Sequence, residues 1–502
     1  MIVETKYGLI QGHPRGEIAE FLGIPYAKPP VGDLRWKEPQ TPEPWEGVYE
    51  AAEFGFPALQ APSQIIPGGD PADRGCIDSG NEDCLYLNVW TPDARQGRKL
   101  PVFVWIQGGA YCCGSGAGMN ASPEPYCSRG IVYVTFNYRL GLMGFFAHPE
   151  LSQESEHHVS GNYQHFDQVA ALRWVKENIE AFGGDPDNIT IGGCSAGAGG
   201  TQVLCCSPLA EGLFARAIIE SNVTFQATTL QQMNPIYKLA DLEQSGIEFM
   251  KKAGCNSVEE MRHTPYEKLI DFEESHFRRK YHYGCSLGTC EDGYLLPHIH
   301  RVAMQQLENK NIPYLVGNTH DEGGEHVYGM TSEKFVRQAQ ELLGEDVQKY
   351  LNLSRYDTLE QIQQSLRKTH FGFIGAKIFA ECSAKQGRAP VYVFDFVRPN
   401  PQRGIAPHAW ETKYLMGTYK RCEGVTEEDD RLADTMQNYW CNFIRTGDPN
   451  GEGLQQWAPY SGDNRCVLYL DSPYYVGTDE QYENEQMRCA RQIITNHVNG
   501  KE

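Results

Sequence analysis

Short runs of apolar residues, bounded by turn-forming residues, recur along the chain. Three of them occupy residues 85–90, 102–106 and 131–136, and each contains β-branched and aromatic side chains. Runs of this length and composition predict buried strands. Before them, residues 1–50 alternate extended patterns with turns, which predicts an N-terminal β-meander.

A helix is predicted after the third run. Apolar side chains recur there at helical spacing: Phe166, Val169, Leu172, Val175 and Ile179. Residues 182–186, Phe-Gly-Gly-Asp-Pro, then supply a glycine cap and a proline stop. Strand and helix patterns continue to alternate, which predicts an α/β fold: a mostly parallel central sheet with helices on both faces.

The pattern changes between about residues 226 and 390, where it becomes largely helical and polar. We expect this region to be inserted into a single domain, residues 1–502, and to cover the functional site. Two apolar runs, 312–317 and 391–396, predict further strands of the central sheet.

Composition narrows the class of protein. The 502 residues are 40% hydrophobic and 22% charged, as in a globular protein, and carry a formal net charge of -21. That charge argues against nucleic acid and anionic membranes as partners. No apolar stretch approaches the roughly 20 residues that span a bilayer, and no basic segment followed by an apolar run opens the chain, so we expect a cytoplasmic protein.

The sixteen cysteines do not form a zinc motif, because no Cys-x-x-Cys occurs. Cys76 with Cys84, and Cys285 with Cys290, would close short loops if oxidised, but a reducing cytosol favours thiols. We expect no metal and no organic cofactor.

The most informative motif is Gly-x-Ser-x-Gly at residues 193–197, directly after a β-branched run. Small residues around Ser195 allow a strand to turn sharply into a helix, which would hold the hydroxyl at the tip of the turn. Cys194 is an alternative nucleophile, but its side chain should point away from that tip.

A serine hydroxyl needs a base and a group that orients the base. In α/β hydrolases the chain order is serine, acid, histidine, and Ser195, Glu322 and His408 fit that order, each after a predicted strand. Asp321, beside Glu322, is an equally plausible acid on these grounds.

Donors for an oxyanion are predicted in the Gln-Gly-Gly-Ala loop at residues 107–110. The backbone N–H groups of Gly109 and Ala110 can point inward there, with the N–H of Ala196 as a third donor. The alternative is that residues 107–110 form an ordinary tight turn with no role in catalysis.

The chain resembles the type B carboxylesterases, which include bacterial para-nitrobenzyl esterases and the cholinesterases. The resemblance is carried by Phe-Leu-Gly-Ile-Pro-Tyr-Ala at 21–27, Pro-Pro-Val-Gly at 29–32, Glu-Asp-Cys-Leu-Tyr-Leu-Asn-Val-Trp at 82–90, Asn-Tyr-Arg-Leu-Gly at 137–141, residues 182–186 and the serine motif. It implies an α/β-hydrolase fold, a triad of Ser195, Glu322 and His408, and oxyanion donors at Gly109, Ala110 and Ala196. By resemblance, then, Glu322 is preferred to Asp321.

Two residues depart from the family pattern: Cys194 replaces the usual glutamate before the nucleophile, and Gln107 replaces a frequent histidine. Neither change removes a donor or a triad member. The cholinesterase branch is disfavoured, since residues 57–85 contain no aromatic side chain to face a quaternary ammonium group.

These features predict a serine carboxylesterase that hydrolyses small-molecule esters through an acyl-enzyme. One alternative is a non-catalytic binding module of the same fold, and another is the same machinery acting on thioesters or amides. The oligomeric state is not predicted.

Overall fold

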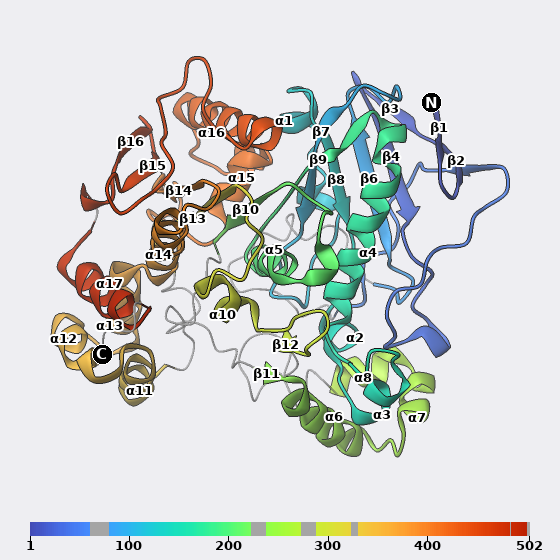
Figure 1. The fold of residues 1–502 in the computed structure, drawn as a ribbon, viewed down its shortest axis with the longest axis horizontal. Helices are drawn as coiled ribbons and strands as arrows, with labels where there is room; N and C mark the ends of the chain where they lie inside the picture. Colours follow the sequence, from blue (N-terminus) through green and yellow to red (C-terminus); the bar gives the residue numbers. More distant parts are fainter. Residues whose placement is uncertain (61–79, 222–236, 273–287, 323–329, 482, 499–502) are drawn as a thin grey trace. The chain divides into compact units, whose positions relative to one another are not determined.

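The structure is a computed structural model that describes residues 1–60, 80–221, 237–272, 288–322, 330–481 and 483–498. The chain divides into two compact units. Figure 1 labels the helices and strands and colours them along the sequence. Unit 1 comprises Met1–Ala215 and Asn234–His300, and unit 2 comprises Arg216–Met233 and Arg301–Glu502.

The main sheet strands of unit 1 pair in the order β9-β7-β8-β6-β4-β3. Their bounds are β3 (His13–Arg15), β4 (Ile18–Pro25), β6 (Tyr86–Thr91), β7 (Leu100–Ile106), β8 (Val132–Phe136) and β9 (Gly184–Cys194). The pairs β9–β7 and β7–β8 are parallel, and the pairs toward β3 are antiparallel. The three buried strands predicted from apolar runs are therefore confirmed as β6, β7 and β8.

The predicted N-terminal β-meander is present only in part, as two antiparallel hairpins. β1 (Ile2–Thr5) pairs with β2 (Gly8–Gln11), as β3 does with β4, and β5 (Val48–Glu50) adds to β2 in parallel.

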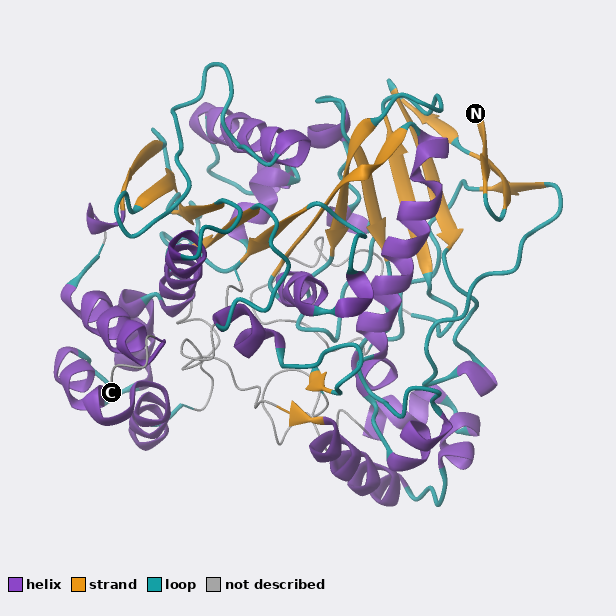
Figure 2. Ribbon diagram, viewed as in Figure 1, coloured by secondary structure: helices purple, strands orange, loops and turns teal. Residues whose placement is uncertain are grey.

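Helices pack on the sheet of unit 1. The predicted helix is α4 (Tyr163–Asn178), which lies against β9 beside α5 (Ala196–Cys206), as Figure 2 shows. The other described helices of this unit are α1 (Glu124–Cys127), α2 (Gly141–Phe145), α3 (Pro149–Glu154), α6 (Leu239–Ala253), α7 (Val258–His263) and α8 (Tyr266–Phe272). A cluster of buried apolar side chains that includes Trp36, Phe146 and Phe249 joins α2 to α6 and α7. Near it, β11 (Tyr237–Lys238) pairs with β12 (Cys290–Glu291).

The sheet strands of unit 2 pair in the order β16-β15-β14-β13-β10. The strands are β10 (Arg216–Glu220), β13 (Tyr314–Thr319), β14 (Val391–Phe396), β15 (Cys466–Leu470) and β16 (Tyr475–Thr478). All neighbours are parallel except β15 and β16. The predicted strands at 312–317 and 391–396 are confirmed as β13 and β14, and every residue of both strands is buried.

The helices of this part of the chain are α10 (His300–Gln305), α11 (Ser332–Leu343), α12 (Val347–Leu353), α13 (Leu359–Thr369), α14 (Phe371–Lys385), α15 (Trp410–Leu415), α16 (Glu427–Thr446) and α17 (Glu485–Val498). α14 packs on β13 and β14, and α17 contacts α12, α13 and α14. The described part of residues 226–390 is mainly helical, with the short strands β11 and β12 and the sheet strand β13. That this region is an insertion over the active site, within one domain of residues 1–502, stays a prediction.

Two predictions about cysteines fall partly on residues that are not described. Cys84 and Cys290 are buried thiols, whereas Cys76 and Cys285 lie outside the described residues. Among the helices that the structure describes, none combines the length and the apolar character that a membrane crossing requires.

Candidate active site

Ser195 lies on a sharp turn between β9 and α5. Its backbone angles, φ 60° and ψ −124°, fall in a region that costs a non-glycine residue roughly 1–3 kcal/mol. The helix begins at the next residue, Ala196. Ser195 is half-buried, whereas Cys194 is only 3% exposed, so the serine is the more accessible of the two at the turn.

The glycines of the motif are required by the end of the neighbouring strand. A Cβ on Gly197 would lie 2.1 Å from the carbonyl oxygen of Ile106, and a Cβ on Gly193 would lie 2.5 Å from the same atom. Atoms cannot approach so closely, so any larger residue would push the turn away from β7. This contact explains why Ser195 stands between two glycines.

The loop that follows β7 lies against this turn. A Cβ on Gly108 would be 2.7 Å from the carbonyl oxygen of Cys194 and 3.4 Å from the Cβ of Ser195. Gly109 and Ala110 both have positive φ angles, 111° and 53°. The loop therefore turns sharply within contact distance of Ser195.

The same loop exposes backbone donors. The carbonyl oxygen of Gly109 accepts the N–H groups of Cys112 and Cys113, both at 3.0 Å. Within the described ranges, we find no hydrogen bond donated by the N–H groups of Gly109, Ala110 or Ala196. Unit 1 thus places the loop after β7 beside the turn of Ser195, and the three N–H groups stay the predicted oxyanion donors.

Gln107, at the start of the loop, is almost completely buried. Its carbonyl oxygen accepts the hydroxyl of Tyr138 at 2.6 Å. Neither polar atom of its side-chain amide has a hydrogen-bond partner among the described residues. Gln107, which stands where the family often has a histidine, therefore places a buried amide at the start of the candidate oxyanion loop.

In unit 2, two residues meet beyond the carboxyl ends of parallel strands. β13 and β14 pair in register from Tyr314 with Val391 to Thr319 with Phe396. Glu322 follows the first strand closely, and His408 comes after the second. The Nδ1 atom of His408 lies 2.7 Å from Oε1 of Glu322, and both side chains are mostly buried, 18% and 15% exposed.

Asp321, the other candidate acid, has a different partner. Its Oδ2 atom accepts the N–H of Ala406 at 2.8 Å, and its own N–H donates to the carbonyl oxygen of Ala406 at 3.2 Å. Asp321 therefore braces the loop before His408, and the carboxylate on the imidazole is that of Glu322.

The electrostatics keep Glu322 ionised. Burial alone would raise the pKa of Glu322, but the charge and hydrogen bond of His408, with a further hydrogen bond from Asn318, outweigh it and lower the pKa. The Asn318 side-chain N–H group donates to Oε2 of Glu322 at 3.2 Å. A carboxylate that accepts the Nδ1 proton of His408 leaves Nε2 as the basic nitrogen.

The sequence analysis missed two buried carboxyl groups in unit 2, Glu220 and Glu411. Ser221 donates its hydroxyl to Oε1 of Glu411 at 2.5 Å, and the indole N–H of Trp440 donates to Oε1 of Glu220 at 2.8 Å. Burial, aided by the charge of Glu322, raises the pKa of Glu411 to about 7. Burial and the charge of Glu411 likewise raise the pKa of Glu220. The only sequence signal was the position of Glu411, three residues after His408.

Comparison with known proteins gives a consistent result. The sequence model of the carboxylesterase family matches residues 1–490. The chain is 33% identical over 500 residues to para-nitrobenzyl esterase of Bacillus subtilis (strain 168), covering 97% of this chain and 98% of that protein. It is 32% identical over 512 residues to the medium-chain fatty acyl-CoA hydrolase precursor of Anas platyrhynchos, covering 93% and 88%. A solved thermophilic PNB esterase matches with a TM-score of 0.84 at 30% identity, over 97% of this chain and 99% of that one.

Proposed function

The chain belongs to the carboxylesterase family, and from this premise we propose that Ser195, His408 and Glu322 are its catalytic triad. It is a serine carboxylesterase with the α/β-hydrolase fold. The observation that carries the assignment of the triad is the hydrogen bond between His408 Nδ1 and Glu322 Oε1, because it leaves Nε2 of the imidazole to accept a proton.

In the proposed acylation step, Ser195 Oγ attacks the carbonyl carbon of the ester while His408 Nε2 takes the hydroxyl proton. The carboxylate of Glu322 stabilises the imidazolium that forms. The N–H groups of Gly109, Ala110 and Ala196 donate to the developing oxyanion, and one such donor is typically worth about 10²–10³ in kcat. His408 then gives its proton to the departing alcohol.

In the proposed deacylation step, a water molecule attacks the acyl-enzyme. His408 removes a proton from that water, the same oxyanion donors act again, and the bond between the acyl group and Ser195 Oγ breaks. The carboxylic acid leaves and the serine recovers its proton from His408. The cycle requires His408 Nε2 to come within hydrogen-bond reach of Ser195 Oγ, roughly 2.6–3.2 Å.

Thioesters are a second candidate substrate class. The duck relative is named a fatty acyl-CoA hydrolase, and its similarity spans 93% of this chain. A thioester offers the same carbonyl carbon to Ser195, so the proposed machinery applies to it unchanged. Nothing among the relatives favours the non-catalytic alternative, since those compared are named as esterases or hydrolases.

The test is hydrolysis of para-nitrophenyl esters of increasing acyl length, with acyl-CoA thioesters of matching length assayed in parallel. We expect Ser195→Ala to lose ester hydrolysis while Ser128→Ala, an exposed serine of the same unit, keeps it. Equal activity in Ser195→Ala and wild type would contradict the assignment. The ratio of ester to thioester kcat/KM then ranks the two substrate classes.

We also propose that the protein works in the cytoplasm. The support is the thiol state of the buried Cys84 and Cys290, since thiols persist in reducing compartments. Cell fractionation followed by immunodetection tests this, and recovery outside the cytoplasmic fraction would contradict it.

A further inference from the structure

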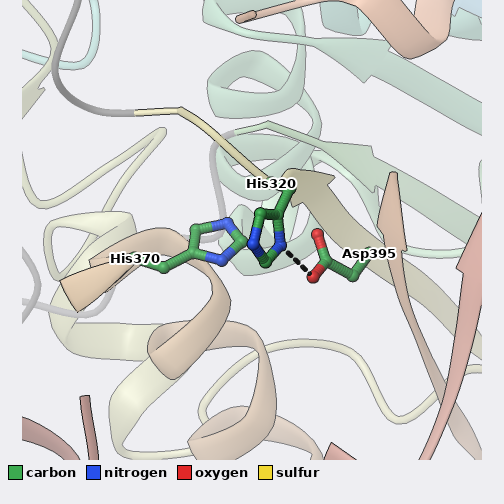
Figure 3. A group of neighbouring side chains, drawn as sticks. All are labelled: His320, His370 and Asp395. Atoms are coloured by element: carbon green, nitrogen blue, oxygen red, sulfur yellow. Dashed lines mark hydrogen bonds and ion pairs between the residues drawn. The ribbon is translucent and has the colours of Figure 1, made fainter. Parts of the chain in front are cut away.

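Three ligand-type side chains, those of His320, His370 and Asp395, meet in unit 2 (Figure 3). His320 directly follows β13, Asp395 lies within β14, and His370 stands between α13 and α14. The Nδ1 atom of His320 is 2.8 Å from Oδ2 of Asp395, and the rings of His320 and His370 lie 5.5 Å apart at 74°. One ligand atom from each of the three residues lies within 4.8 Å of the others.

Part of this cluster is buried without partners. Asp395 is fully buried and His370 is 3% exposed. Among the described residues, neither Oδ1 of Asp395 nor either ring nitrogen of His370 has a hydrogen-bond partner. Buried polar atoms in native proteins are almost always paired, so these three call for an additional group.

The chemistry of the unpaired atoms selects that group. A neutral imidazole offers one lone pair and one N–H group, so one ring nitrogen of His370 can bind a cation. The Oδ1 atom of Asp395 offers lone pairs only. An anion cannot satisfy two electron-pair donors, whereas a cation can.

A cavity gives access to the cluster. It measures about 250 Å³ and is lined by His320, His370 and Asp395 together with Asp321, Arg367 and Lys368. Arg367 is half-exposed and Lys368 is exposed, so they can turn toward solvent. The buried Lys377, whose charge also acts on His370, lies 3.3 Å from carboxylate oxygens of both Asp479 and Glu483, which offset it.

We propose that His320, His370 and Asp395 bind a divalent transition-metal ion, with Zn²⁺ the best fit and a water molecule from the cavity as fourth ligand. Two imidazoles and one carboxylate are typical zinc ligands, whereas Ca²⁺ and Mg²⁺ prefer oxygen alone. Zinc bonds of about 2.0–2.1 Å require the ligand atoms to move closer together, which rotation of the His320 and His370 side chains permits. The ion replaces the proton between His320 and Asp395, which is released to solvent.

Such an ion would hold the turn that carries Glu322. His320 lies two residues before Glu322, and Asp321 between them is bonded to the backbone of Ala406. An ion joining the end of β13 to β14 and to the start of α14 therefore braces this turn. Its role is structural, and it takes no part in the proposed chemistry of Ser195.

The experiment uses Co²⁺ as a probe, because tetrahedral Co²⁺ absorbs visible light far more strongly than octahedral Co²⁺. The whole chain is stripped with chelator, desalted and titrated with Co²⁺. We expect one ion per chain and a tetrahedral spectrum in wild type and in Ser195→Ala. We expect that spectrum to be lost in His370→Gln and Asp395→Asn. The matched control is His263→Gln, in the exposed trio with Asp33 and Glu259, which should keep it.

The proposal is overturned if wild type gives no tetrahedral spectrum, or if His370→Gln and Asp395→Asn keep it. It is also overturned if inorganic phosphate binds to the stripped protein at this cavity and Co²⁺ does not. Should both variants fail to fold, two readouts remain: loss of the spectrum in His320→Gln, and a rise in the melting temperature of stripped wild type on adding Zn²⁺. Absence of either effect rejects the site. Retention of the spectrum in inactive Ser195→Ala separates this result from the proposed triad.

Discussion

Replacing Glu322 with glutamine tests which acid serves His408. Glu322→Gln keeps the shape of the side chain but removes the charge that faces Nδ1 of His408 at 2.7 Å. With charge centres about 4 Å apart and an effective dielectric constant near 20, that charge is worth about 4 kcal/mol to the imidazolium. At about 1.4 kcal/mol per factor of ten, we expect kcat to fall by roughly 10³-fold.

The assay is steady-state hydrolysis of para-nitrophenyl butyrate, with active sites counted by a stoichiometric inhibitor and folding checked by circular dichroism. Asp321→Asn is the matched control, because its carboxylate accepts the N–H of Ala406 and does not contact the imidazole. We expect that control to lose less than about tenfold in kcat. The reasoning is refuted if Glu322→Gln stays within tenfold of wild type, or if Asp321→Asn loses as much as Glu322→Gln.

Three further predictions concern the loop and the buried groups. Gly109→Ala would place a Cβ 2.0 Å from the carbonyl oxygen of Cys113, which would displace the loop that carries the proposed oxyanion donors. We therefore expect kcat for the same ester to fall at least about 10²-fold. A loss under threefold would contradict the assignment of these donors. Burial raises the pKa of Glu411 to about 7, so the folded state binds more protons than the unfolded state between about pH 4.5 and 7, and stability falls as pH rises through that range. Urea unfolding of Glu411→Gln should therefore show a gain over wild type at pH 8 that disappears at pH 5; a gain independent of pH would count against this. Gln107→Met removes an unpartnered buried amide, so urea unfolding should show unchanged or higher stability, by about 1 kcal/mol, and a clear loss would reveal a hidden partner.

Local features made much of the fold predictable. The apolar runs became β6, β7, β8, β13 and β14 because a strand buried on both faces must be apolar at nearly every position. The serine motif could also be recognised from the sequence, because Gly193 and Gly197 must be glycine to fit against the carbonyl oxygen of Ile106. Both constraints act within a few residues of the chain.

Contacts between distant residues were harder to predict. Composition and order could not separate Glu322 from Asp321, since neighbouring side chains point in different directions and only the folded turn decides which one reaches His408. Glu411 was overlooked because carboxylates are usually on the surface, and nothing local marks a buried one.

The cluster of His320, His370 and Asp395 was likewise absent from the sequence analysis, which expected no metal. No short motif joins these residues, because β13, the start of α14 and β14 bring them together from separate parts of the chain. The three side chains come together only when β13 pairs with β14 and α14 packs on both strands, so the sequence alone does not indicate the cluster.

The central claim is that Ser195 is the nucleophile, and covalent trapping tests it most directly. Incubation with a para-nitrophenyl alkylphosphonate, which mimics the tetrahedral intermediate, should release one para-nitrophenol per chain and stop ester hydrolysis. Tandem mass spectrometry of the peptide containing residues 189–200 then locates the added group. The account predicts the phosphonate on Ser195 and none on Cys194; a label on Cys194, or inactivation without a label on Ser195, would contradict it.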